Sequence, residues 1–201
     1  MERLIAGYRE FRGGRWPQER RLYESLAQGQ SPETFVLSCC DSRVDPATIF
    51  NAAPGELFVA RNVANLVPPF EEQGSYHGTS AALEFAVNSL KVKTVLVLGH
   101  AQCGGVAAAL APAEQTPGSF LNEWIKLLDP ALARCADHEG DRWEAVERES
   151  IRLSLERLQS FPFVAEAIRS RGLALRGARF GIADGVLEVL DPATGAFLAQ
   201  E

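Results

Sequence analysis

The sequence predicts an α/β fold: a mainly parallel sheet flanked by helices, with an N-terminal helical arm. Three short apolar runs have the character of strands, and they cover residues 35–38, 57–60 and 94–98. Helical patterns alternate with the later runs, which is typical of a parallel sheet. Strands as apolar as these are expected in a sheet that is covered on both faces.

The chain suits a single domain over residues 1–201, because it is long enough for one core and 46% of its residues are hydrophobic. We divide it into a helical arm over 1–29 and an α/β core over 30–201. The arm reads as two helical pieces broken at Gly13-Gly14, with apolar residues at helical spacing. Its apolar face must pack either on its own domain or on a partner subunit.

The elements of the core follow in order along the chain. Asp45-Pro46 opens a short helical turn between the first two strands, and a helix is expected over 81–90 with Thr79 or Ser80 as its cap. The remaining expected elements are a helix at 106–110, a mostly helical stretch over 119–171 interrupted near Pro130 and Pro162, and late strands at 178–182 and 186–190.

Composition narrows the class of protein. The net charge of −6 gives no electrostatic reason to expect nucleic acid or an anionic membrane as a partner. No apolar run approaches the ~18 residues of a membrane span. The N-terminal residues lack the apolar region of a secretory signal, so we expect a cytoplasmic protein. In that reducing compartment the four cysteines are more often metal ligands or catalysts than disulfide partners.

Two thiols and an imidazole follow the ends of predicted strands. Cys39 comes directly after the first strand, and His100 and Cys103 follow the third. Carboxyl ends of neighbouring parallel strands meet at one edge of a sheet, where ligand sites form. Each residue alone would more often be a core cysteine or a hydrogen-bonded histidine, but together they favour zinc. Three protein ligands leave the fourth position for water, which is the catalytic pattern.

Asp41 and Arg43 stand two and four residues after Cys39. An arginine is always charged, so Arg43 would keep Asp41 ionised and able to accept a hydrogen bond. Cys40 lies between Cys39 and Asp41 and is interpreted as a packing residue on the opposite face. A redox pair of Cys39 and Cys40 is the weaker interpretation, because vicinal cysteines close a strained disulfide. Cys135 is expected to be an inert helical cysteine.

These motifs resemble the β-class carbonic anhydrases. The family pattern Cys-x-Asp-Ser-Arg stands at 39–43, and His-x-x-Cys-Gly-Gly stands at 100–105. The likeness extends through 54–69 and 78–86, and it is weak beyond about residue 115. It implies reversible hydration of CO₂ to bicarbonate and a proton by zinc-bound hydroxide, and a homodimer or a tetramer built of dimers.

The resemblance also implies roles for single residues. Cys39, His100 and Cys103 would bind Zn²⁺, and Asp41 and Arg43 would form the catalytic dyad. Four residues match the family's substrate pocket, part of which comes from the neighbouring subunit: Gln30, Phe58, Val63 and Gly104.

The match favours the plant-like subgroup, whose site is open. A second subgroup, in which the aspartate can close onto zinc, carries a tryptophan where this chain has Val36, and Gln30 also fits the open group. Phe85 replaces a pocket tyrosine, Arg61 is interpreted as structural, and His77 as a solvated histidine rather than a proton shuttle. Hydrolysis of COS or CS₂ and a non-catalytic zinc domain remain as alternative functions.

Overall fold

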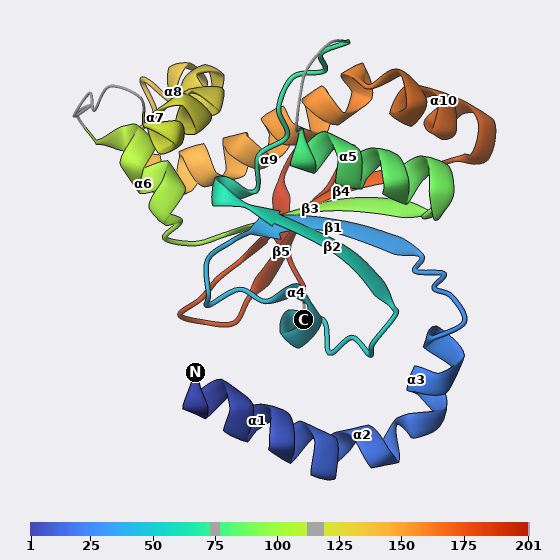
Figure 1. Cartoon of the computed structure of the whole chain (residues 1–201). Helices are drawn as coiled ribbons and strands as arrows, with labels where there is room; N and C mark the ends of the chain where they lie inside the picture. Colours follow the sequence, from blue (N-terminus) through green and yellow to red (C-terminus); the bar gives the residue numbers. More distant parts are fainter. Residues whose placement is uncertain (73–76, 112–118, 201) are drawn as a thin grey trace.

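The computed structural model describes residues 1–72, 77–111 and 119–200, and its centre is a six-stranded sheet within those ranges (Figure 1). The strand order is β2-β1-β3-β4-β5-β6. The strands β2, β1, β3 and β4 are mutually parallel, whereas β5 runs antiparallel to both of its neighbours, β4 and β6. The strands are β1 (Thr34–Cys39), β2 (Leu57–Asn62), β3 (Thr94–His100), β4 (Ala174–Phe180), β5 (Leu187–Leu190) and β6 (Phe197–Ala199). The predicted mainly parallel α/β sheet is confirmed.

The strand limits differ most near the C-terminus. β4 begins at Ala174 rather than residue 178, because its first half pairs with the start of β3, where Thr94 faces Ala174. Arg176 and Gly177 interrupt the apolar pattern there, so no strand could be predicted from periodicity over its first half. β6 was not predicted at all, since it is three residues long and two of them are exposed.

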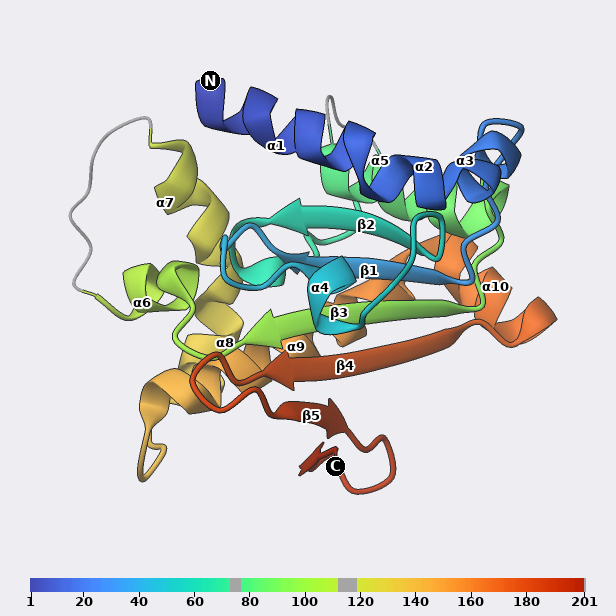
Figure 2. The same ribbon diagram turned by 90° about the horizontal axis from the view of Figure 1, so that it is seen from below.

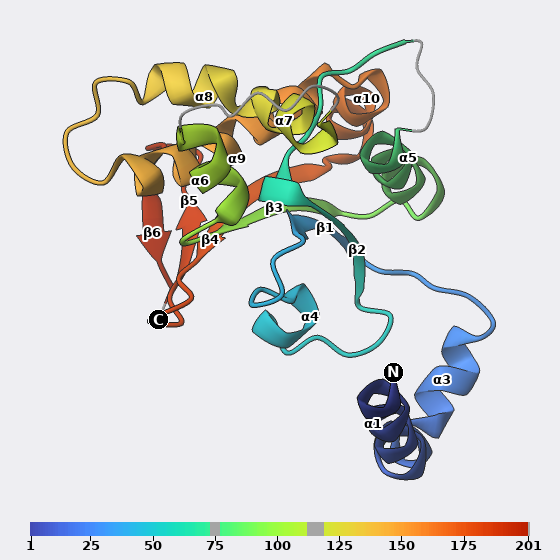
Figure 3. The ribbon, with the colours of Figure 1, turned by 60° about the vertical axis from the view of Figure 1, so that its left-hand side comes forward.

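Most of the helices cover one face of the sheet (Figures 1 and 3). The helix α9 packs on β3 and β4. Gly99 and Gly177 permit this close approach: a Cβ on either would lie 2.7 Å from a side-chain carbon of Ile151. The helices on this face are α5 (Gly78–Glu84), α6 (Gly104–Leu110), α7 (Phe120–Ile125), α8 (Asp129–Arg134), α9 (Arg142–Ser160) and α10 (Pro162–Arg171). None of the helices in the described ranges has the length and hydropathy needed to cross a bilayer.

On the opposite side of the sheet, the only helix of the described residues close to the strands is α4 (Pro46–Ile49), and the N-terminal arm lies on that side further away (Figure 2). The first turn of α4 is capped by the Asp45 side chain. Beside α4 lies a groove of about 370 Å³, which we call the open sheet face. Val36, Leu96 and Val189 are among its lining residues. The cover expected on both faces is therefore incomplete within one chain.

The N-terminal arm stands away from the core (Figure 3). It contains α1 (Glu2–Gly13), α2 (Arg15–Gln18) and α3 (Arg20–Leu26), and no residue of the three is buried. The break at Gly13-Gly14 is as predicted, and a second break occurs at Glu19. Leu4 and Tyr8 are 72% and 60% exposed. Leu26 of α3 lies against Gly55, but the exposed apolar residues of α1 are buried by nothing in the described part of the chain.

The helix expected over 81–90 begins earlier and changes type. It starts at Gly78 after His77, and its second half, Phe85–Ser89, is a π-helix. The predicted cap by Thr79 or Ser80 is wrong. Thr79 lies inside α5, where its hydroxyl accepts a hydrogen bond from the Asn62 side chain at 3.2 Å. Short 3₁₀ turns at Val63–Asn65 and Lys126–Leu128 complete the regular structure.

Candidate metal centre

Two neighbouring strands bring the predicted metal ligands together. Cys39 is the last residue of β1 and His100 the last of β3, and these strands pair in parallel. Cys103 immediately precedes α6. One ligand atom from each residue lies within 4.8 Å of the other two, and all three side chains are buried. The expected meeting of strand ends is thus present in the fold.

The turn between His100 and Cys103 folds back through an unusual backbone conformation. Gln102 has φ of +55°, which side-chain-bearing residues rarely adopt. Gly105 allows α6 to start close to the 3₁₀ turn, since a Cβ there would lie 2.8 Å from Val63 and 2.9 Å from Ala64. The chain therefore holds Cys103 against Cys39 at the cost of local strain.

The two sulfurs lie 3.9 Å apart and interact directly. Either thiol could donate in this contact, and the interaction lowers the pKa of Cys39 and raises the pKa of Cys103. Burial works against either charge, whereas backbone N–H groups favour the thiolates: those of Asp41 and Ala64 at Cys39, and those of Gly105 and Val106 at Cys103.

His100 is oriented by its backbone. Its Nδ1 hydrogen-bonds the Ala101 carbonyl at 2.9 Å, which leaves Nε2 as the ligand atom. That Nε2 is buried and finds no hydrogen-bond partner among the residues that the structure describes. Burial lowers the pKa of His100, but the neighbouring Cys39 and the Ala101 carbonyl outweigh it, and the net shift is upward.

The arrangement fits zinc. Two sulfurs bound to a tetrahedral Zn²⁺ at ~2.3 Å would lie about 3.8 Å apart, close to the 3.9 Å found here. A buried nitrogen with no partner, aimed at a pair of thiols, is the donor set that this ion prefers. Three protein ligands leave one coordination position for a small molecule.

Asp41 is held by Arg43 through a two-pronged ion pair. Arg43 Nε donates to Oδ1 at 2.9 Å and Nη2 to Oδ2 at 2.7 Å, and the Arg43 backbone N–H adds a bond of 3.0 Å. These hydrogen bonds hold the pKa of Asp41 well below its usual range. Asp41 Oδ2 lies 4.0 Å from His100 Nε2, so the carboxylate stands beside the metal ligands. Arg43 also donates to the Gln102 carbonyl at 3.2 Å, which joins the two ligand loops.

The four predicted pocket residues fall into two groups. Val63 and Gly104 lie beside the ligands, next to Ala64 and Cys103. Phe58 faces Phe35 across the strand pair, four residues before the level of Cys39, which corresponds to about 13 Å of strand. Gln30 precedes β1 and is exposed. Within one chain, Gln30 and Phe58 therefore lie at the opposite end of the sheet from the metal ligands.

Arg61 has a larger part in the site than its sequence position showed. Its guanidinium donates to the carbonyls of Cys39 at 2.8 Å, Asp41 at 2.7 Å and Val44 at 3.3 Å. The structural role expected for it is thus the bracing of the loop that carries one ligand and the dyad. A second support missed by sequence reasoning is α9, which holds the Cys103 backbone through Trp143 and Glu147. Neither shows a local motif.

The remaining candidates lie apart from the centre. Cys40 is exposed, so its interpretation as a packing residue is wrong: the chain leaves β1 at Cys39, and strand alternation no longer applies. Cys135 is buried, and burial raises the pKa of its thiol. His77 lies 3.6 Å from Glu71 at the surface, as expected of a solvated residue.

Comparison with known proteins gives consistent relatives. A family model described as carbonic anhydrase matches residues 34–187. Beta carbonic anhydrase 3 of Arabidopsis thaliana is 36% identical over 197 residues, covering 94% of this chain and 76% of the relative. The solved structure of the beta-carbonic anhydrase CcaA aligns with a TM-score of 0.92 and 32% identity, over 100% of this chain and 92% of that chain. A tetrameric beta-carbonic anhydrase of Sordaria macrospora aligns with a TM-score of 0.84 and 31% identity, over 94% and 95% of the two chains.

The matched region contains the metal ligands, the Asp41–Arg43 pair and the parallel part of the sheet. Family and geometry agree, because the family model spans a Cys-His-Cys group whose ligand atoms could hold one metal ion. The chain belongs to the β-class carbonic anhydrase family, and its function is the zinc-dependent hydration of carbon dioxide.

Proposed function

We propose that Cys39, His100 and Cys103 hold one Zn²⁺ per chain and that this centre converts CO₂ and water reversibly to bicarbonate and a proton. The observation that carries the proposal is the buried His100 Nε2, which has no partner and lies with two sulfurs in one cluster beside Asp41. When bound, zinc lowers the pKa of a water molecule and so makes the hydroxide nucleophile available near neutral pH.

The protein's own groups orient that nucleophile. With zinc bound, Asp41 would accept a hydrogen bond from the nucleophile through Oδ2, the carboxylate oxygen 4.0 Å from His100 Nε2. Arg43 keeps Asp41 charged and turned away from coordination, because both carboxylate oxygens already bond the guanidinium. This pairing supports the open form of the site. Val63 and Gly104 lie next to Ala64 and Cys103 in the chain, and their lack of polar side-chain atoms suits an apolar substrate.

The test is stopped-flow CO₂ hydration on protein of measured zinc content, with release of H₂S from COS followed alongside. We expect hydration proportional to bound zinc. COS hydrolysis without CO₂ hydration would favour the alternative substrate, and neither reaction in zinc-loaded protein would favour a non-catalytic zinc domain.

The ligand assignment has an internal control. Cys39→Ser and Cys103→Ser should lose zinc and activity together, whereas Cys40→Ser should keep both because its side chain is exposed outside the cluster. Stoichiometric zinc in either ligand variant would contradict the assignment.

We further propose a homodimer, or a tetramer built of dimers, in which each site is completed by the other subunit. Three features support this: an arm without buried residues, the open sheet face, and the distance of Gln30 and Phe58 from their own chain's ligands. The charge of the arm also supports it, because residues 1–29 hold six arginines against four acidic residues in a chain of net charge −6.

A cytoplasmic location is proposed from the free state of all four cysteines, and fractionation would test it.

A further inference from the structure

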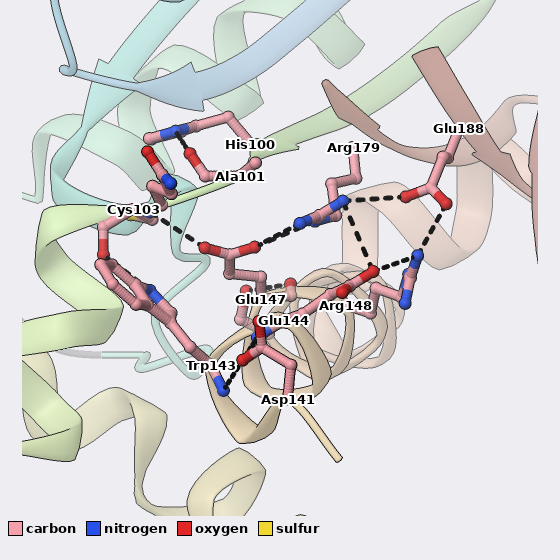
Figure 4. Close-up of polar contacts among 12 residues, drawn as sticks. His100, Ala101, Cys103, Asp141, Trp143, Glu144, Glu147, Arg148, Arg179 and Glu188 are labelled. Atoms are coloured by element: carbon pink, nitrogen blue, oxygen red, sulfur yellow. Dashed lines mark hydrogen bonds and ion pairs between the residues drawn. The ribbon is translucent and has the colours of Figure 1, made fainter. Parts of the chain in front are cut away.

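Two side chains of the helix α9 hydrogen-bond the backbone of Cys103, one of the proposed metal ligands (Figure 4). Glu147 Oε1 accepts the Cys103 N–H at 3.0 Å, and Trp143 Nε1 donates to the Cys103 carbonyl at 3.3 Å. The two side chains are one helical turn apart, so they project from the same face of α9. Cys103 follows the strained Gln102 and stands outside both β3 and α6, so no strand or helix bond satisfies its N–H.

The groups around Glu147 match a carboxylate, because donors face both of its oxygens. It is only 3% exposed, and burial raises its pKa. Both of its oxygens nevertheless face donors: Oε1 faces the Cys103 N–H, and Oε2 faces Arg179 Nε at 3.0 Å and Nη2 at 2.9 Å. A protonated acid would have no acceptor for its own hydrogen here.

Arg179 is held in turn by a network of charged side chains that extends to β5. Its Nη1 lies 3.1 Å from Glu188 Oε2 on β5. Arg148 joins Glu188 to Glu144 with contacts of 2.6 Å each. The buried Glu147 is therefore compensated and cannot shift without breaking bonds on both of its sides.

We propose that Glu147, held by Arg179, is a positioning residue that sets the Cys103 thiolate for metal binding. The inference rests on the proposed zinc site. The carboxylate fixes the peptide that carries Cys103 against the strain at Gln102, and this keeps Sγ 3.9 Å from Cys39 Sγ. Residues that hydrogen-bond a metal-ligating residue and so orient it typically change metal affinity by ~10–100-fold when they are removed.

The test measures the metal centre itself, not turnover. Zinc affinity is determined by competition with a chelator, and the absorption spectrum of Co²⁺-substituted protein reports the coordination geometry. Four proteins are compared: wild type, Glu147→Ala, Glu147→Gln and the matched control Glu188→Gln. Glu188 belongs to the same network of charged side chains but does not touch Cys103.

We expect Glu147→Ala to lose ~10–100-fold in zinc affinity and to shift the cobalt bands. Glu147→Gln keeps an oxygen acceptor and should fall between it and wild type. Glu188→Gln should retain wild-type affinity and spectrum even where its thermal stability drops, which separates positioning from simple stabilisation.

Wild-type affinity and spectrum in Glu147→Ala would overturn the proposal. If that variant does not fold, identical values for Glu147→Gln and Glu188→Gln would overturn it equally. Absence of bound zinc in the wild type would instead refute the proposed function.

Discussion

At the scale of single residues, the site depends on groups that are each held from more than one side. Asp41 is bonded by the Arg43 side chain and backbone, and Arg61 bonds three carbonyls of the same loop. Such multiple bonding fixes a side chain more firmly than one contact does, because displacement breaks several bonds together. Catalytic geometry here is therefore a property of the loop over 39–44 as a unit.

Replacing Asp41 with Asn should leave zinc in place and reduce the rate of CO₂ hydration by ~10²–10⁴-fold, because the positioned proton acceptor is lost. The matched control is Glu33→Gln, an exposed carboxylate paired with Lys93 at the far end of β1. Stopped-flow rates per bound zinc check the expectation. Turnover near that of the wild type in Asp41→Asn would remove Asp41 from the mechanism.

The lowered pKa of Asp41 also predicts how the activity of Asp41→Asn should depend on pH. The Arg43 hydrogen bonds hold the pKa of Asp41 well below its usual range, so the charged form and its stabilising pair are complete at and above that range. They are lost only when the pH falls through the lowered value. The midpoint of the activity profile near neutral pH should therefore belong to another group and persist in Asp41→Asn, displaced only by the loss of a neighbouring charge, while the plateau falls. Disappearance of that midpoint in Asp41→Asn would mean that Asp41 itself titrates there.

Arg61→Met should destabilise the fold by ~1–3 kcal/mol, because it leaves carbonyls of the ligand loop without donors. Urea denaturation at fixed protein concentration measures this. Arg169→Met, which removes an arginine that is 70% exposed and paired with Glu166, should change little. Equal midpoints for the two variants would contradict the bracing role.

At the scale of elements, the ligands could be predicted from the sequence because each follows the end of an apolar strand. The positions of Cys39, His100 and Cys103 needed only the rule that parallel strands end at one edge. Trp143 and Glu147 could not be found this way, because their partner is a backbone group some forty residues earlier. The cap expected at Thr79 failed for a similar reason: a tertiary hydrogen bond from Asn62 engages its hydroxyl.

The start of α6 offers a paired test of packing. Gly105→Ala would place a methyl group 2.8 Å from Val63 and 2.9 Å from Ala64, whereas Gly104→Ala meets nothing within 4 Å. We expect Gly105→Ala to lower the free energy of unfolding by ~1–3 kcal/mol through overpacking, with Gly104→Ala close to wild type. Thermal denaturation of the two zinc-loaded variants distinguishes them. Equal melting temperatures would show that α6 can shift to accommodate the added methyl group without loss of stability.

At the scale of the whole molecule, one chain brings the three proposed metal ligands together, whereas Gln30 and Phe58 of the predicted pocket lie at the other end of its sheet. The parallel core was predictable from periodicity, whereas the bare second face was not, because a sequence shows that a surface is apolar without showing which chain covers it. The same holds for the arm, whose apolar face fitted either its own domain or a partner.

A complementation experiment tests the shared pocket. Gln30→Ala chains and Cys39→Ser chains, carrying different tags, are co-expressed and the mixed dimer is purified. If Gln30 serves the neighbouring site, the mixed dimer has one complete site and should show about half of wild-type activity. Both parent dimers should be weaker. A mixed dimer no more active than the Gln30→Ala parent would place Gln30 in its own chain's site.

The arm without buried residues also bears on how activity first arises. A newly folded chain could load its metal alone, since the ligands all come from one core. If the proposed dimer is the active form, that chain would remain inactive until it associated with a second copy. Recovery of activity after dilution from denaturant should then follow second-order kinetics, with a half-time inversely proportional to protein concentration, whereas metal uptake should not depend on concentration. The number of encounters between chains, as well as their folding, would set how quickly a cell acquires the enzyme.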